Sequence, residues 1–490
     1  MYVSLQLPPG LVSTGTDYDT KGRYVSGDLM RFYQGSIMPI GGWALRSDEM
    51  VSGLARASLT WVDNSNQAWI GIGTNTHLYV MSRSGDLSDI TPVGFTPGAA
   101  DATAAGGYGS GVYGSLTYGT PRPDSVNIQP ASVWSLDTFG EDLVGVMDSD
   151  SKIYEWMLST GTPAQTVANA PQAYALLTTQ ENILMALGVD GDPRYIKWSA
   201  IQDDTDWTPT VTNQARDATL QTQGAIQLGK RIPGGLLILT NEGAFLGTYV
   251  GPPFVYTFQR VGSGCGAVSR QCAAVTQSAT YWMGRNGFYA YSGITTPLAC
   301  DVQDYVFSDI NLTQSSKITA VLNSDFNEVW WNYPSSSSIE IDRYVIFNYL
   351  EGTWGYGMLD RTSGTGSNGV LQYPVMISAS GGVFDHEIGS VKDGRAPTLR
   401  SAPVELGKGD NVIMLHRYIP DQRAAGVCQV QFHVRQWPNG PITMYGPYDS
   451  TSPTDLRITG RQMEVEYIGG IDVDFRIGDF RFDAHTGGKR

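Results

Sequence analysis

Seven copies of one short phrase recur along the chain: an apolar strand, a tight turn rich in Gly, Asn or Asp, and a second strand that carries aromatic residues. After a longer first interval, successive copies start 40 to 53 residues apart. A repeat of this length, built of hairpins, predicts stacked β-sheet units. We therefore expect an all-β chain with a β-propeller-like repeat region, whose blade number the phrases alone leave open. The copies are AWIGIGTNTHLYV (68–80), LVGVMDSDSKIYEW (143–156), ILMALGVDGDPRYIKW (183–198), LLILTNEGAFLGTY (236–249), TYWMGRNGFYAY (280–291), EVWWNYPSSSSIEIDRYVIF (328–347) and PVMISASGGVFDHE (374–387).

The turns and strands inside the phrases favour hairpins that are covered on both faces. The Asp-Gly pair at 190–191 and the Asn-Gly pair at 286–287 supply the positive φ angles that tight hairpins need. Uninterrupted apolar runs such as LLIL (236–239) are typical of strands buried on both sides. Stacked blades meet this requirement better than a single sheet with one face in water.

Composition agrees with a turn-rich sheet protein. The chain has 490 residues, which is too long for one ordinary hydrophobic core. A propeller divides such a length into small cores, one between each pair of blades. The 58 Gly, 26 Tyr and 12 Trp, with only 16% charged residues, suit aromatic-packed sheets joined by tight turns.

Three regions follow from changes along the sequence. Residues 1–47 are broken by Pro and Gly and predict an irregular, extended arm that serves assembly, with Phe32 and Trp43 as its anchors. Residues 48–390 carry the propeller, which includes a Gly- and Tyr-rich insertion at 98–125 that is either a surface loop or a docking tip. Residues 391–490 predict an antiparallel β-sandwich that serves as a platform or interface domain.

Strict alternation supports this last domain. In VCQVQFHVRQW (427–437), Val427, Gln429, Gln431 and His433 fall on one face, whereas Cys428, Val430, Phe432 and Val434 fall on the other. RQMEVEYIGG (461–470) alternates in the same way. A period of two with one polar face predicts an antiparallel sheet with one face in water.

The charge balance argues against a protein that grips nucleic acid. The chain has 47 acidic and 32 basic residues, a net charge of −15, and shows no basic stripe. The excess of acid either serves solubility or keeps the surface from adhering to DNA.

The four cysteines have neither CxxC spacing nor a histidine at a metal-ligand interval, which predicts buried thiols in a reducing compartment. The N-terminus lacks the pattern of a signal peptide, and no apolar run is long enough to span a membrane. We expect a chain that is assembled in the cytoplasm, without cofactor or metal.

Few residues suggest catalysis. The best carboxylate group is Asp203, Asp204 and Asp206 in SAIQDDTDWTP, which either caps a local turn or serves glycoside hydrolysis. Asp148 and Asp150 have part of the spacing of a calcium loop but lack its continuation, so a turn is favoured there too. The five histidines are scattered, and no nucleophile elbow or phosphate-binding loop is present. We expect no catalytic site.

Two stretches resemble a known family. GRYVSGDLMRFYQGSIMPIGGW (22–43) and YGPYDSTSPTDLRITGRQMEVEY (445–467) are similar to the tail hub, or nozzle, proteins of short-tailed bacteriophages, also called packaged-DNA stabilisation proteins or tail tubular protein B. LYVMSRSGDLSDITP (78–92) and WTPTVTNQARDATLQ (207–221) are similar in phrasing. The insertion at 98–125 departs from the family pattern.

The resemblance implies a structural virion protein that is not an enzyme. It implies a homo-oligomeric ring, a hexamer, that joins the head-to-tail adaptor and portal to tail fibres or spikes, and that retains and conducts double-stranded DNA without reading its sequence. The alternative is a carbohydrate-binding propeller that recognises a receptor, or a propeller glycosidase.

Residues are assigned to these roles as expectations. Arg31, Trp43, Arg457 and Arg461 are the expected assembly contacts, because Arg and Trp are favoured anchors of interfaces. The alternative for them is intramolecular ion pairing and core packing. Acidic turn residues that could face the DNA channel are Asp148, Asp150, Asp203, Asp204 and Asp206.

Overall fold

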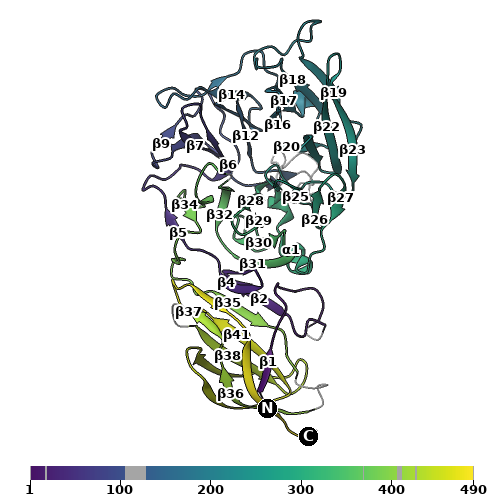
Figure 1. Ribbon diagram of the computed structural model, residues 1–490. Coiled ribbons are helices and arrows are strands. Elements are labelled where there is room, and N and C mark those ends of the chain that lie inside the picture. The colour runs from purple at the N-terminus through teal and green to yellow at the C-terminus, as the bar shows by residue number, and fades with distance from the viewer. Residues whose placement is uncertain are drawn as a thin grey trace, which may run out of the picture.

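The computed structural model describes residues 2–16, 19–104, 128–367, 369–405, 411–424 and 428–488. A ring of sheets forms the larger body, and a smaller β-domain lies below it, with both chain termini at its far end (Figure 1). Helix is confined, in these residues, to α1 (Gln303–Asp309) and the 3-10 segments η1 (Val189–Gly191) and η2 (Leu312–Lys317). The predicted all-β class is confirmed.

The ring consists of seven four-stranded antiparallel sheets in the described part of the chain, so it is a seven-bladed β-propeller. Each of the seven repeated phrases supplies the two middle strands of one blade. The blades are, in order, β6 (Ala55–Val62), β7 (Ala68–Thr74), β8 (Leu78–Ser82) and β9 (Leu87–Asp89); β12 (Trp134–Phe139), β13 (Asp142–Met147), β14 (Ile153–Trp156) and β15 (Gln165–Thr166); β16 (Ala175–Thr178), β17 (Leu184–Leu187), β18 (Tyr195–Trp198) and β19 (Arg216–Thr219); β20 (Ile226–Ile232), β21 (Gly235–Thr240), β22 (Gly243–Gly251) and β23 (Val255–Ser263); β24 (Ala273–Val275), β25 (Thr280–Met283), β26 (Phe288–Tyr291) and β27 (Thr295–Pro297); β28 (Thr319–Asn323), β29 (Glu328–Tyr333), β30 (Arg343–Asn348) and β31 (Thr353–Met358); and β32 (Arg361–Thr365), β33 (Val375–Ser378), β34 (Val383–His386) and β5 (Trp43–Leu45).

The uninterrupted apolar runs are explained by packing on both faces of each blade. In β17, Met185 and Leu187 join one core together with Ile238 of the next blade. Leu184 and Ala186, which point the other way, join a separate core shared with the preceding blade. Both sets of alternate positions are therefore buried, as strands covered on two sides require.

The first interval between phrases is longer because it holds an insertion after the first blade. Its base is a two-stranded ladder of β10 (Thr103–Ala104) and β11 (Ile128–Gln129). Residues 105–125 of the predicted insertion lie outside the described residues.

The seventh blade takes its outer strand from the beginning of the chain. β5 pairs antiparallel with β34, with Ala44 opposite Asp385 and Trp43 opposite His386. Phe32 and Trp43 are both buried, so the prediction that they anchor this segment is confirmed. The prediction that residues 1–47 are irregular is wrong, since β1 to β5 lie within them.

The smaller domain consists of antiparallel sheets in which N-terminal strands form one edge and C-terminal strands form the rest. β1 and β2, from the predicted arm, are strands of this domain, so its boundary is not at residue 391 alone. The sheets are β2 (Tyr24–Asp28), β35 (Thr398–Ser401), β41 (Gln462–Ile468), β38 (Gln429–Arg435) and β39 (Thr443–Asp449); β1 (Tyr2–Leu5), β43 (Phe480–Thr486), β36 (Ile413–Ile419) and β40 (Thr454–Gly460); and β3 (Met30–Tyr33), β4 (Ser36–Pro39), β42 (Phe475–Ile477) and β37 (Gln422–Ala424).

The two predicted faces of β38 are present, but the polar face is partly covered. Cys428 and the apolar alternates of β38 lie in the core, as predicted. On the opposite face His433 is buried and its Nε2 lies 2.6 Å from Glu466 Oε2. Beside it, Glu464 binds both Arg400 and Arg435. Val427 lies outside the described residues.

Candidate functional site

Arg31, an expected assembly contact, is buried where the propeller meets the smaller domain. Its guanidinium donates to Glu387, at 2.8 Å from Nη1 to Oε2, and to Glu328, at 3.0 Å from Nη2 to Oε2. It also lies 3.6 Å from the centre of the Phe326 ring. Arg31 thus follows the alternative interpretation, an intramolecular ion pair, and offers no contact on the surface of this chain.

Trp43 is likewise an interior residue. Its indole Nε1 donates to Asp393 Oδ2 at 2.7 Å, and its ring stacks on His386 with 5.4 Å between centroids. The Arg361 guanidinium lies 5.1 Å from the indole. Trp43 therefore holds β5 against the seventh blade, and it does not reach the surface.

The other two expected contacts remain accessible. Arg457 is exposed on β40, and Arg461 is half-buried in the turn between β40 and β41. These positions are open to another molecule in the single chain, and their role as contacts stays a prediction.

The acidic residues of the predicted turns are held by local partners. Asp203 Oδ1 accepts from the Thr205 amide at 3.0 Å and from its hydroxyl at 2.6 Å, and Asp206 accepts from Asn213 Nδ2 at 2.8 Å. Asp204 is buried, and this burial raises the pKa of its carboxyl. The geometry agrees with turn capping, and none of the three lines the central cavity described below.

Asp148 and Asp150 are also engaged. Asp148 Oδ2 lies 3.1 Å from Arg270 Nη2, and Asp150 Oδ2 accepts from the Tyr154 hydroxyl at 2.5 Å. A channel between copies of the chain would exist only in an assembled ring. The expectation that these acids face such a channel therefore stays a prediction.

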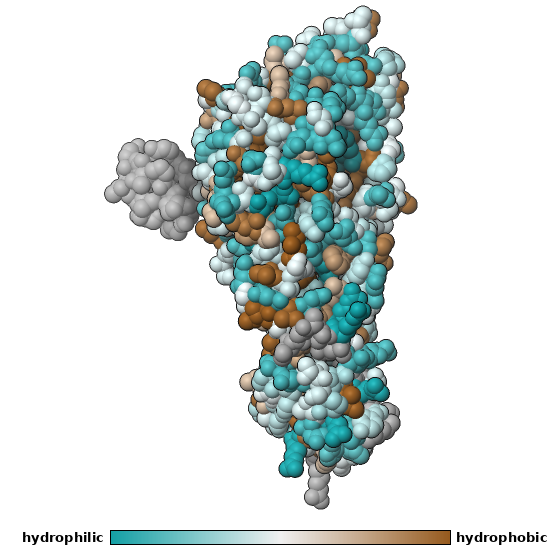
Figure 2. Space-filling model, turned by 60° about the vertical axis from the view of Figure 1, so that its left-hand side comes forward, coloured by the Kyte–Doolittle hydropathy of each residue, from teal (hydrophilic) through white to brown (hydrophobic). Residues whose placement is uncertain are grey.

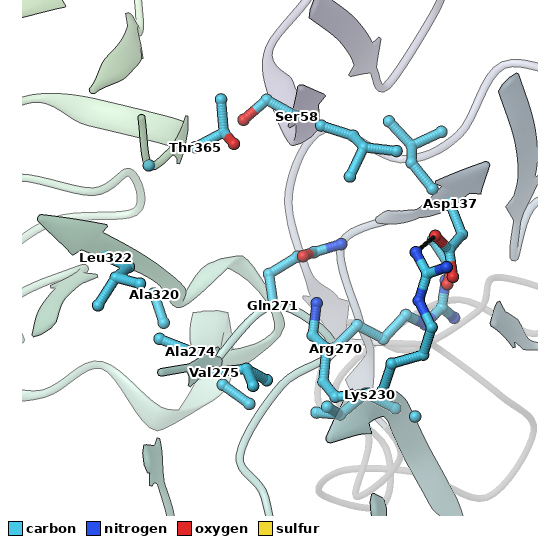
Figure 3. A pocket seen from close by; sticks show the side chains of 18 of the residues that line it. Ser58, Asp137, Lys230, Arg270, Gln271, Ala274, Val275, Ala320, Leu322 and Thr365 are labelled. Carbon is cyan, nitrogen blue, oxygen red and sulfur yellow. Dashed lines mark hydrogen bonds and ion pairs between the residues drawn. The ribbon is translucent and has the colours of Figure 1, made fainter. Parts of the chain in front are cut away.

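A central cavity of about 300 Å³ lies on the axis of the propeller. The first strand of every blade contributes to its wall, and these strands contact one another in a ring. Leucine and alanine side chains cover part of the wall, and hydroxyls of Ser58 and Thr365 cover another part (Figure 3). Because seven rigid blades support this wall, its side chains are held in fixed positions.

The charged residues of the cavity gather on one side. Arg231 Nη2 pairs with Asp137 Oδ1 at 2.7 Å, and Asp137 Oδ2 also accepts from the Thr178 amide. Arg270 is buried, pairs with Asp148 and donates to the Val133 carbonyl. Arg270 also covers the Tyr174 ring, which fixes its plane.

Lys230 differs from these two arginines. Figure 3 shows its side chain reaching into the cavity beside Gln271. It makes no side-chain hydrogen bond or ion pair within the described part of the chain. Burial among the inner strands lowers the pKa of its ammonium group, and the Asp137 carboxylate opposes that shift.

Sequence reasoning missed this cavity because its residues come from seven segments of the chain. One signal was available: the adjacent Lys230 and Arg231 are two charged residues in an inner strand that has no other charge. Two neighbouring cations in a strand expected to be buried require either partners or a ligand.

Two other features are absent from the described residues. No group of three or more His, Cys, Asp or Glu side chains could hold a metal ion there. No helix among them is long and apolar enough to cross a membrane. Each of the four cysteines keeps a thiol, and Cys265, Cys272 and Cys428 are buried.

The fold and the axial cavity define a seven-bladed β-propeller protein with a second β-domain that is built from both ends of the chain. No protein-family model matches the chain, and no curated protein matches it. Among solved structures, a streptogramin B lyase is 8% identical with a TM-score of 0.43, over 70% of this chain and 96% of the other.

Virginiamycin B lyase from Staphylococcus aureus is also 8% identical, with a TM-score of 0.41 over 70% and 97% of the two chains. The WD40 domain of Neurospora crassa Pan2 is 7% identical, with a TM-score of 0.40 over 74% and 99%. With identities below 10% and TM-scores below 0.5, these matches carry no inference about this chain.

Proposed function

We propose that this chain is a structural subunit of a virion, the tail hub or nozzle of a short-tailed bacteriophage. Copies of it form a ring, expected to be a hexamer, that conducts and retains the genome and connects the adaptor to tail fibres or spikes. The proposal rests on the sequence resemblance of residues 22–43 and 445–467 and on the surface feature described next.

The observation that supports self-assembly is an exposed apolar surface at the junction of the two domains. Figure 2 shows hydrophobic side chains gathered near the level where the propeller meets the smaller domain. Segments that join there expose Leu45, Met358, Val391 and Ile471, each between 41% and 56% exposed. We call these four residues the waist patch. An apolar patch that is exposed to water is typical of sites that bind another protein.

The same residues are mounted on a rigid junction. The Trp43 amide donates to the Val391 carbonyl, and the Ser390 hydroxyl donates to the carbonyl of Asp472, next to Ile471. Because strands of both domains and the Arg31 ion pairs cross this junction, the patch keeps its shape. A preformed apolar surface loses little conformational entropy when it binds a second copy.

DNA would have to pass between subunits in such a ring. The axial cavity of one propeller measures about 300 Å³ and is walled by residues from all seven blades. A duplex, whose major groove alone is about 12 Å wide, is far too large for it. The net charge of −15 per chain suits a wall along which phosphates slide without adhering.

The test is the assembly state of the purified chain and of its waist variants. We expect rings in negative-stain images and a matching mass by mass photometry, alone or with the adaptor and portal. Val391→Asp and Ile471→Asp should weaken association by about tenfold or more, because each places a charge in an apolar contact. Val211→Asp, at a fully exposed position on the propeller, is the matched control and should assemble normally.

A protein that stays monomeric at all concentrations and never joins portal complexes would contradict the proposal. Assembly that is equally strong in Ile471→Asp and in wild type would contradict the role of the waist patch.

A further inference from the structure

The axial cavity contains more positive than negative charge, in a protein that is acidic overall. Lys230, Arg231 and Arg270 line it, and Asp137 and Asp148 are the carboxylates that pair with the arginines. Three cations against two anions leave one net positive charge, although the whole chain carries −15. The excess belongs to Lys230, because each arginine has its own carboxylate.

The position of this excess charge, inside the cavity, costs hydration free energy. Lys230 lies on the inner strand β20, between Gly229 and the paired Arg231, and its side chain extends into the cavity (Figure 3). An ammonium group in a narrow, protein-walled space loses part of its hydration. It is stabilised either by water that fills the cavity or by an anion that replaces that water.

We propose that the axial cavity of the propeller binds a small oxyanion of the phosphate class, with Lys230 as the central charged donor. Arg231 on the same strand and Gln271 just before β24 also line the cavity, and the N–H groups left over from their bonds to Asp137 and to the Trp134 carbonyl supply directional contacts. Lysine is a common phosphate-binding residue because its ammonium acts as a point charge with three donors.

Size and rigidity narrow the class of ligand. A volume of about 300 Å³ accepts an inorganic phosphate with several waters, or a small phosphorylated molecule, but not a folded chain or a duplex. Leucine side chains from β6, β12 and β16 form an apolar part of the wall. A charge-assisted contact is stronger where apolar walls lower the local dielectric. The inference is independent of ring assembly.

The experiment compares thermal stability with and without inorganic phosphate, at constant ionic strength in a phosphate-free buffer. Phosphate should raise the Tm of the wild-type chain, because a ligand that binds only the folded state stabilises it. Isothermal titration calorimetry then gives the affinity, which Lys230→Met should weaken by about tenfold or more. Lys230→Arg keeps the charge and should retain binding even if Lys230→Met folds poorly.

Lys152→Met is the matched control, since it removes one exposed lysine outside the cavity. It should bind phosphate as the wild type does. The proposal is overturned if phosphate leaves the Tm of the wild type unchanged, or if Lys230→Met and wild type bind it equally. A response to citrate but not to phosphate overturns the assignment to the phosphate class.

Discussion

A single buried arginine ties three distant segments together. Arg31 of β3 lies between Glu328 of β29 and Glu387, which follows β34, and both carboxylates are within hydrogen-bond distance. Two carboxylates share one guanidinium, so one negative charge has no cation of its own. Burial therefore raises the pKa of Glu328 to about 7, an effect that Arg31 opposes and Glu387 reinforces.

This raised pKa makes stability depend on pH in a defined direction. Folded Glu328 holds its proton up to about pH 7, whereas an unfolded glutamate loses it near 4.5. Its contribution to the free energy of unfolding is complete below pH 4.5 and is lost as pH rises through 7. Glu328→Gln cannot ionise and still accepts from Trp330 Nε1. The free energy of unfolding of this variant, relative to that of the wild type, should therefore rise by about 3 kcal/mol as pH increases from below 4.5 to above 7.

Urea unfolding at several pH values measures this difference. Asp325→Asn changes an exposed carboxyl on the turn before β29 and serves as the control. If Glu328→Gln and wild type keep a constant difference in unfolding free energy across the window, Glu328 is ionised in the folded protein throughout.

At the scale of elements, the short strand β5 closes the propeller. It is the outer strand of the seventh blade, and its partner β34 lies near the other end of the repeat region. The Arg46 amide donates to the Val383 carbonyl, so the pair Arg46–Val383 is a hydrogen-bonded pair of the ladder. Alternation then makes Ala44–Asp385 a hydrogen-bonded pair too, while the Leu45 amide points away from β34.

Two proline substitutions test this closure. Ala44→Pro removes a ladder hydrogen bond and should destabilise the propeller by about 1–3 kcal/mol. Leu45→Pro leaves the ladder bonds intact, because an edge strand tolerates proline where its amide faces outward. It should therefore cost clearly less, although it also removes a half-exposed side chain. Calorimetric melting distinguishes the two variants. Equal destabilisation by the two variants would show that the hydrogen bonds of β5 in this register do not contribute to the stability of the propeller.

At the scale of the whole molecule, the proposed ring implies a dependence of assembly on charge. Each chain carries −15, so copies in a ring repel one another, and six copies would carry at most −90. Salt screens this repulsion, because the Debye length falls from about 10 Å at 0.1 M to about 3 Å at 1 M. The apolar contact of the waist patch does not weaken with salt in the same way.

Ring formation should therefore strengthen as salt rises over that range, and mass photometry at fixed protein concentration measures it. Duplex DNA should show no binding even at low salt, because the contact would release few counterions. A gel-shift assay with a short duplex tests this second point. Tight binding that weakens steeply with salt would contradict a surface along which DNA slides.

Much of the propeller could be predicted from the sequence. Each repeated phrase is a hairpin whose two strands are neighbours in the chain, and its turn residues specify the connection locally. The number of blades was not predictable from the phrases, because the seventh blade depends on β5 from the N-terminal segment. The turn function of Asp203 and Asp206 was also foreseeable, since Asp caps backbone close to itself in sequence.

The assignments that failed or were missed involve partners far apart in the chain. Arg31 and Trp43 were expected at an interface because their residue types favour interfaces, but Glu328, Glu387 and Asp393 enclose them. The axial cavity was not predicted, because its charges come from different blades and become neighbours only when the ring closes.

The sequence by itself determined the repeating hairpins, the two-sided burial of their strands and the acidic character of the whole chain. These properties depend on residue type and on neighbours a few positions away. Only the tertiary structure decided that the N-terminal strands close the propeller and complete the smaller domain. It also decided that Arg31 is an internal ion pair and that Lys230 faces an axial cavity. The physical reason is that strand pairing, burial and charge compensation between residues hundreds of positions apart depend on which surfaces come into contact. The residues near each position in the sequence do not specify those contacts.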